Sequence, residues 1–274
     1  MSSPKQDLIV YNDNSIISEK ILESNQSYLS IISHIQGTAP TWLVNSLIEN
    51  GLQGTSTLIT NESPSKINGR SEVVFISFSH PELFYIKNCK KNGLELSSMK
   101  NFHYIDCFTD LFTKIIKNVN EPANDIKAMF ANISSQIQKI QNSKIVIFFE
   151  NPLILLQATT LTSNELLYYI FQLNKLCRNL FIITNQDQSS IIDLSTSNHS
   201  DPVFKASDFL VKLYHRSQLN IHLKPLETGR ANDITGCLII SHGAVNYDIE
   251  NLFVREQEYI FNLTKDANVS LFYR

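Results

Sequence analysis

Short apolar runs recur along the first two thirds of this chain, and segments with helical spacing separate them. The clearest runs cover residues 72–78 and 144–152, and each is apolar at most positions. A strand that is apolar on both sides is buried on both sides, which is typical of a parallel sheet between two layers of helices. Further strands are expected at 28–33, 102–106 and 179–184. The alternation predicts an α/β fold with a mostly parallel central sheet and helices on both faces.

Helices are expected between these strands, where apolar residues recur at steps of three and four positions. Pro81 favours a helix start before residues 82–91, because proline is well tolerated in the first turn. Gly51 marks the expected end of a helix that begins near Trp42. The other helices are expected at 110–117, 123–140 and 165–176.

The pattern changes after residue 185. A polar stretch from Asn185 to Ala206 has no periodicity and predicts a long loop at the carboxyl end of a core strand. Beyond it, short apolar segments predict strands that extend the sheet in antiparallel fashion. These strands are expected at 209–214, 220–223, 236–241, 258–263 and 271–273.

Two further segments complete the expected organisation. Residues 7–11 predict an N-terminal edge strand, and residues 51–69, rich in Gly, Ser, Thr, Asn and Pro, predict a mobile surface loop. With 274 residues, the chain is long enough to bury a large core. We expect one domain that spans residues 1–274.

Composition limits the function classes. The formal net charge of -3 argues against a stand-alone nucleic-acid binder, so a nucleic-acid contact requires a local basic patch. Charged residues make up only 18%, which suits large subunit interfaces. The four cysteines form no C-x-x-C pair, and we expect buried free thiols. With no long apolar stretch, the sequence predicts a soluble cytoplasmic protein, with the nucleus as a second location, and no membrane contact.

Residues 28–47 predict a strand, a tight turn and a helix, the arrangement in which nucleotide-binding folds hold phosphate. A functional phosphate loop has the spacing G-x-x-x-x-G-K-[ST], because glycines allow close approach and the lysine binds the outer phosphates. The turn here is Gln36-Gly37-Thr38-Ala39-Pro40-Thr41-Trp42, with one glycine and no lysine. Pro40 also removes an N–H donor, and Trp42 places a bulky ring where the lysine would stand. The sequence therefore predicts the strand, turn and helix of a nucleotide-binding fold without a functional Walker A motif.

Catalytic and metal-binding patterns are otherwise absent from the sequence. Glu150 ends the strongest strand, where nucleotide hydrolases place an acid, but without a phosphate-binding lysine we expect a solvated loop residue or a cap. His103, Asp106 and Cys107 lie close in sequence, yet His103 and Asp106 point to opposite faces of a strand, so core packing is the expected role of this group. No metal-ligand spacing occurs, and we expect neither catalytic residues nor a metal site.

A modest basic run follows the polar stretch and is interleaved with aromatic residues. It contains Lys205, Lys212, His215, Arg216 and Lys224. Two interpretations remain open, the solvated face of a hairpin and a phosphate-contacting surface. Residues 226–236 then predict a hairpin connection with Arg230 at its tip, within reach of a neighbouring subunit or a phosphate.

The chain resembles the family of the sixth subunit of Elongator, the eukaryotic complex that modifies the wobble uridine (U34) of tRNA. The resemblance spans nearly the whole chain. It rests on the turn 36–45 without a phosphate loop, on the pattern Leu226-x-Thr228-Gly229-x-Ala231-x-Asp233-Ile234-Thr235-Gly236, and on the ending from Glu258-Tyr259 through Leu271-Phe272-Tyr273-Arg274. The pattern at residues 226–236, called here the late motif, and the ending at 258–274 are the more specific parts of the resemblance.

This resemblance implies a RecA-like fold and a heterohexameric ring with the fourth and fifth Elongator subunits. It implies a non-catalytic accessory subunit, with tRNA bound by the ring, ATP only at ring interfaces, and the radical chemistry in a separate catalytic subcomplex. Loops 151–163 and 185–206 would face the pore. The candidate tRNA contacts are Lys205, Lys212 and Arg216, and Arg230 is a candidate for an interface or the edge of a nucleotide site.

Two alternatives remain. One is an active NTPase with a degenerate phosphate loop, which the missing lysine and the single glycine disfavour. The other is a RecA-like paralogue that serves DNA repair or circadian-type assemblies, which would share the fold but not the late motif.

Overall fold

The computed structural model describes residues 5–59, 65–116, 122–187, 198, 200–227, 229, 231, 233–264 and 268–274. The strands are β1 Tyr28–His34, β2 Glu72–Ser77, β3 Phe102–Asp106, β4 Ile145–Glu150, β5 Asn179–Asn185, β6 Leu219–Lys224, β7 Gly236–His242, β8 Gln257–Leu263 and β9 Val269–Tyr273. The α-helices are α1 Glu19–Glu23, α2 Thr41–Gln53, α3 Glu82–Lys91, α4 Pro122–Gln138, α5 Leu153–Ala158, α6 Ser163–Asn174 and α7 Pro202–Tyr214. A 3₁₀-helix, η1 Leu96–Ser98, and a π-helix, η2 Leu111–Ile115, complete the elements.

The strands form one sheet in the order β3-β2-β4-β5-β1-β6-β7-β8-β9. From β3 to β6 every neighbouring pair is parallel, and from β6 to β9 every pair is antiparallel. The predicted α/β fold with a mostly parallel sheet and antiparallel C-terminal strands is confirmed. The antiparallel part begins only with β7, because β6, which was expected to be antiparallel, joins β1 in parallel register.

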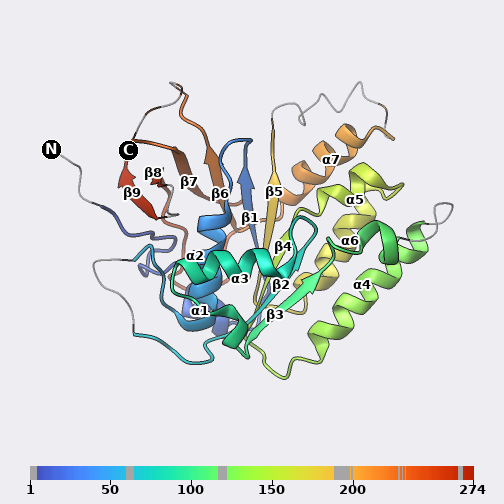
Figure 1. The fold of residues 1–274 in the computed structure, drawn as a ribbon, viewed down its shortest axis with the longest axis horizontal. Coiled ribbons are helices and arrows are strands. Elements are labelled where there is room, and N and C mark those ends of the chain that lie inside the picture. Colours follow the sequence, from blue (N-terminus) through green and yellow to red (C-terminus); the bar gives the residue numbers. More distant parts are fainter. Residues whose placement is uncertain are drawn as a thin grey trace.

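Helices cover both faces of the sheet, as predicted (Figure 1). One core lies between the sheet and α1, α2 and α3, and the other lies between the sheet and α4, α5, α6 and α7. Strand β1 shows why most positions of these runs are apolar: Ile32 packs into the first core, whereas Leu29 and Ile31 pack into the second. Successive side chains on a strand point to opposite faces, so burial on both faces requires apolar residues at both sets of positions.

The predicted strand at 209–214 is wrong, since these residues belong to α7. The Asp201 side chain caps the helix by accepting a hydrogen bond from the Val203 N–H at 2.7 Å, and Pro202 occupies the first turn. Phe204, Phe209 and Leu213 are buried at four- and five-residue steps. A six-residue window is too short to separate this period from a strand.

The predicted end of α2 at Gly51 is also wrong. The helix continues to Gln53, and Gly54 ends it with a left-handed φ of 79° and an N–H bonded to the Asn50 carbonyl at 2.8 Å. Gly51 lies inside the helix because α2 packs closely on β2. A Cβ at Gly51 would stand 3.0 Å from Cγ2 of Val73.

Other expectations are met in part. The N-terminal segment makes only isolated bridges, Gln6 to Leu271 and Tyr11 to Val254, so it is not a regular strand. Part of the expected surface loop 51–69 is buried, since Leu58 is in the core, and residues 60–64 lie outside the described residues. In the expected helix 110–117 the described part is π-helical. Within loop 151–163, residues Leu153–Ala158 form α5.

The cysteine prediction is confirmed. All four thiols are free and buried, at Cys89, Cys107, Cys177 and Cys237. Burial raises the pKa of Cys89 and of Cys107 to about 12, which keeps both as neutral thiols at physiological pH.

Candidate functional site

The turn between β1 and α2 lies at the carboxyl ends of the parallel strands (Figure 1). In open α/β sheets, ligands bind in the crevice outside these strand ends. A phosphate at such a turn would be held by backbone N–H groups that point outward. The geometry of residues 35–42 therefore decides whether a phosphate can be held here.

Two backbone donors of this turn, the N–H groups of Gln36 and Thr38, are engaged within the protein. Asp187, just after β5, accepts a hydrogen bond from the Gln36 N–H at 2.8 Å, so a carboxylate occupies one position that a phosphate oxygen would need. The Thr38 N–H donates to the Ile35 carbonyl at 3.0 Å, and the Thr38 hydroxyl donates to the same oxygen at 2.7 Å. Pro40 has no N–H. The negative charge of Asp187 beside the turn would repel a phosphate.

Trp42 does not project into this turn. Its side chain is 6% exposed, and its ring centre lies 5.0 Å from that of Phe261 on β8. The tryptophan therefore packs α2 onto the antiparallel part of the sheet. Where a phosphate loop would place a lysine, this chain has a core residue.

Glu150 is buried, and the prediction of a solvated loop residue is wrong. It is only 7% exposed. Ser77, directly beside it on β2, donates its hydroxyl to Oε2, and Tyr85 on α3 donates to Oε1 at 2.5 Å. His80 Nδ1 lies 3.3 Å from Oε1. No local pattern around Glu150 indicates these partners, because they lie 73, 70 and 65 positions earlier in the chain.

This carboxylate cluster, formed by Ser77, His80, Tyr85 and Glu150, is internally satisfied. Burial, followed by the neighbouring Glu150 carboxylate, raises the pKa of Tyr85 far above its usual range, so the phenol remains a donor. The Ser77 hydroxyl also accepts from the Ser79 and His80 N–H groups at 3.1 and 3.0 Å. Such an arrangement stabilises the strand ends more readily than it organises a metal ion or a water molecule for hydrolysis.

The side chains of His103, Asp106 and Cys107 have different partners and do not form a common site, as predicted. His103 Nε2 lies 2.8 Å from the Glu72 carboxylate, whereas Asp106 accepts hydrogen bonds from the Phe108 and Thr109 N–H groups. Cys107 is buried in the core. His103 is not a core residue, since 37% of its side chain is exposed, so the expectation of core packing holds only for Cys107.

The three candidate tRNA contacts lie on or just after α7, and each has a contact within the protein. The Lys205 amine donates to the Thr159 carbonyl at 3.1 Å. The Lys212 amine lies 2.6 Å from Asp208. The Arg216 guanidinium carbon lies 4.8 Å from the centre of the Phe171 ring. Their spacing of seven and four residues places them along one side of the helix, not on a hairpin.

Arg230 lies outside the described residues. The connection that carries it joins β6 to β7 as an antiparallel hairpin, as the sequence predicted.

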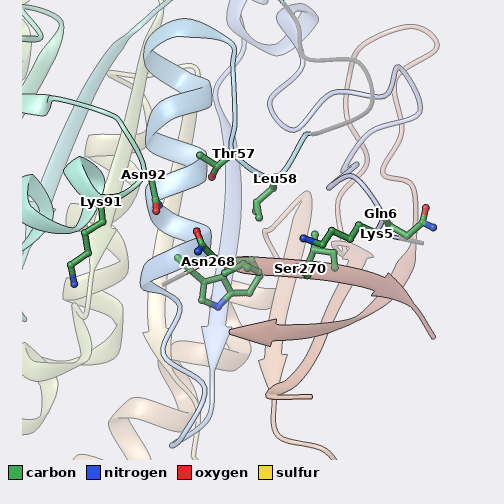
Figure 2. Close-up of a pocket in the computed structure, with 11 residues that line it drawn as sticks. Lys5, Gln6, Thr57, Leu58, Lys91, Asn92, Asn268 and Ser270 are labelled. Carbon is green, nitrogen blue, oxygen red and sulfur yellow. The ribbon is translucent and has the colours of Figure 1, made fainter. Parts of the chain in front are cut away.

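A separate cavity of about 420 Å³ lies between the N-terminal segment, α2, the end of α3 and β9 (Figure 2). Lys5 and Lys91 are among the residues that line it, together with Asn92, Asn268 and Ser270. No carboxylate is found among the described residues of this lining. The cavity lies away from the carboxylate cluster, and sequence reasoning did not find it because its walls come from distant segments.

In the part of the chain that the structure describes, no group of three or more His, Cys, Asp or Glu residues is placed to hold a metal ion. Nor does any helix among the described residues have the length and apolar character needed to cross a membrane.

Comparison with known proteins identifies relatives over the whole chain. Elongator complex protein 6 of Saccharomyces cerevisiae is 30% identical over 100% of this chain and 99% of its own length. The Elongator complex protein 6 homolog of Schizosaccharomyces pombe is 26% identical over 64% of this chain and 68% of its own length. No family model matches the chain.

Solved structures extend the comparison to the fold. A KaiC-like protein from Pyrococcus horikoshii superposes with a TM-score of 0.55 at 11% identity, covering 98% of this chain and 100% of that protein. The flagellar accessory protein FlaH from Methanocaldococcus jannaschii gives 0.52 at 14% identity, with 93% and 95% covered. These similarities show a RecA-like fold. The full-length sequence similarity shows more, and the chain belongs to the Elongator complex protein 6 family.

Proposed function

We propose that this chain is a non-catalytic RecA-like subunit of an Elongator ring that binds tRNA and supports modification of the wobble uridine, U34. The observation that carries the proposal is the full-length similarity to yeast Elongator complex protein 6. It is supported by a phosphate turn that has no lysine and whose Gln36 N–H is taken by Asp187. In a ring, a subunit that has lost the phosphate site still needs the RecA-like fold for its contacts with the neighbouring subunits.

The proposed partners are the fourth and fifth Elongator subunits in a heterohexameric ring, the catalytic Elongator subcomplex, and tRNA. Any ATP would bind between subunits, and this chain alone would hold no cofactor. Exposed apolar side chains support an assembled state: Leu83 is 62% exposed and Phe112 is 55% exposed. We place the protein in the cytoplasm, with the nucleus as a second location.

Assembly is tested by co-expressing the chain with the fourth and fifth Elongator subunits and measuring the mass of the purified complex under native conditions. The expected result is an assembly of six chains that contains all three subunits. A stable monomer of this chain that never co-purifies with either subunit would contradict the ring.

The tRNA contact is tested by charge reversal in the assembled ring. Lys205→Glu, Lys212→Glu and Arg216→Glu, combined, should weaken tRNA binding and reduce its dependence on salt, because each cation contacting a phosphate releases a counterion on binding. Lys87→Glu, on α3 and exposed, is the matched control. Because Lys205 and Lys212 also bind within the protein, ring assembly and thermal unfolding are measured for every variant. Unchanged affinity at low salt would remove these residues from the tRNA interface.

A further inference from the structure

We propose that α6 and α7 together form a surface for single-stranded RNA, made by Tyr168, Phe171, Lys175, Lys212 and Arg216 and called here the α6–α7 face. The inference rests on the proposed tRNA-binding function and deepens it. It names the kind of RNA segment that is recognised and adds three residues that sequence reasoning did not select.

The residues of the α6–α7 face form two neighbouring rows. On α6 and just beyond its end, Tyr168, Phe171 and Lys175 are separated by three and four positions, so they line one side of the helix. Lys212 on α7 and Arg216 just after it are separated by four positions. Each row alternates with buried residues that hold the two helices against the sheet.

Two contacts place the rows side by side. The Lys212 amine lies 2.8 Å from Oδ1 of Asn164, one turn before Tyr168 on α6. The Arg216 guanidinium carbon lies 4.8 Å from the centre of the Phe171 ring, within the range of a cation–π contact. The cations of α7 therefore run along the aromatic row of α6.

Tyr168 is the most exposed aromatic residue of this face, with 60% of its surface open to solvent. Its neighbour Tyr169 faces the core and stacks on Phe130 at 4.5 Å between ring centres with 3° between the planes. Tyr168 meets Tyr169 only edge to face, at 5.6 Å and 69°. An exposed ring held on a rigid helix costs free energy in water, and it is suited to stack on a base.

The charge of this region is locally positive in a chain whose net charge is -3. Lys175, Lys212 and Arg216 contribute three cations, and Asp208 pairs with Lys212. The nearby Glu165 carboxylate accepts from the Thr162 N–H at 2.9 Å and from its hydroxyl at 2.6 Å and keeps its negative charge, so the three cations and the carboxylates of Asp208 and Glu165 sum to one positive charge. Phosphates are thus attracted to this face and not to the surface as a whole.

Aromatic residues and cations together favour a single strand over a duplex. A base in a duplex is already stacked and cannot present its ring to Tyr168, whereas an unpaired base in a loop can do so. The cations then bind the phosphates that flank the unpaired bases. A loop of tRNA, with unpaired bases and a continuous backbone, has this chemistry.

The test uses the full chain assembled with its Elongator partners. Binding of tRNA, of a 12-nucleotide single-stranded RNA and of a blunt RNA duplex is measured by fluorescence anisotropy. Tyr168→Ala should weaken binding of the single strand and of tRNA by about 5- to 100-fold, because base stacking is lost. Tyr168→Phe should retain binding, because the ring remains. Lys175→Gln should lower the salt slope by about one.

Matched controls are Tyr273→Ala on β9 and Lys87→Gln on α3, which lie on other elements and should leave binding unchanged. If the assembly binds tRNA and neither Tyr168→Ala nor Lys175→Gln changes the affinity, the α6–α7 face is wrong and the proposed function stands. If Tyr168→Ala weakens duplex binding as much as single-strand binding, recognition of unpaired bases is wrong. If the unaltered assembly binds none of the three RNAs, the proposed function itself fails, and the face with it.

Discussion

Glu150 is held at the carboxyl end of β4 by side chains from three other positions in the fold. Ser77 and Tyr85 donate to its two oxygens, and His80 lies beside Oε1. A buried carboxylate without partners would be costly, and here the surrounding donors offset that cost. The cluster joins β2, β4 and α3 at the edge of the sheet where nucleotide hydrolases place catalytic groups.

Tyr85→Phe removes one donor from this cluster and leaves Oε1 without its shortest hydrogen bond. Because Tyr85 is fully buried, water cannot replace the phenol, and we expect a loss of about 1–3 kcal/mol in the free energy of unfolding. Urea denaturation of the full chain measures the change. Tyr168→Phe removes an exposed hydroxyl and is the control. An equal, negligible effect of both substitutions would show that the cluster contributes little to stability.

Two histidines at the junction of β1 and β6 predict a dependence of stability on pH. Burial lowers the pKa of His34 below its ordinary value, although Asp187 and Glu150 act in the opposite sense. Burial, with Lys224 and His34, also lowers the pKa of His222. Below about pH 6.5 the unfolded chain binds protons that the folded chain does not, so the free energy of unfolding falls as pH falls.

This stability is fully present above about pH 6.5 and is lost as pH drops toward the lowered pKa values of the folded protein. Thermal unfolding followed between pH 7.5 and 5 should show the decline. The double variant His34→Gln, His222→Gln should show a flatter profile over the same range. A decline of equal steepness in the variant would assign the effect to other groups.

At the scale of elements, α2 shows how a helix end depends on one backbone conformation. Gly54 adopts a φ of 79° and its N–H satisfies the Asn50 carbonyl. The Asn50 side chain in turn donates to the Gly54 carbonyl at 2.9 Å and accepts from the Ile17 N–H at 3.1 Å. The end of α2 is therefore tied to the segment that leads into α1.

Gly54→Ala should destabilise the protein by about 1–2 kcal/mol, because an L side chain is strained in the left-handed region. Gly54→Asn should cost less, since asparagine tolerates this conformation better than alanine. Both are compared with the parent chain by urea denaturation. If the alanine variant is as stable as the asparagine variant, the helix ends without need of a left-handed residue.

Elements also show the limit of sequence patterns. The buried strands were predicted within one or two residues, because apolar runs on both faces leave little choice of period. Helix α7 was missed because Phe209–Tyr214 is a short apolar segment whose helical partners, such as Phe204, lie in the stretch taken as a loop. The candidate tRNA residues therefore lie on or just after a helix and not on a hairpin. Only the structure shows which residues of α6 lie beside them.

For the whole molecule, the turn without a lysine predicts no nucleotide binding by the chain alone. Isothermal titration of the purified chain with ATP and Mg²⁺ should show no binding at micromolar concentrations, since the turn lacks lysine and Asp187 faces its N–H. Asp187→Asn is included to test whether the carboxylate alone excludes phosphate. Micromolar binding that is lost on substituting Gly37 or Thr41 would support the NTPase alternative.

The buried parallel strands, the missing phosphate-binding lysine and the family could all be predicted without the structure, because they depend only on residue types and their order. The tertiary structure alone decided what surrounds Glu150, whose partners Ser77 and Tyr85 lie 73 and 65 positions away. It also decided that Asp187 accepts a hydrogen bond from a turn 151 positions earlier and that α6 and α7 share one face. Burial and hydrogen bonding depend on which distant segments meet, and no local pattern of residues encodes that meeting.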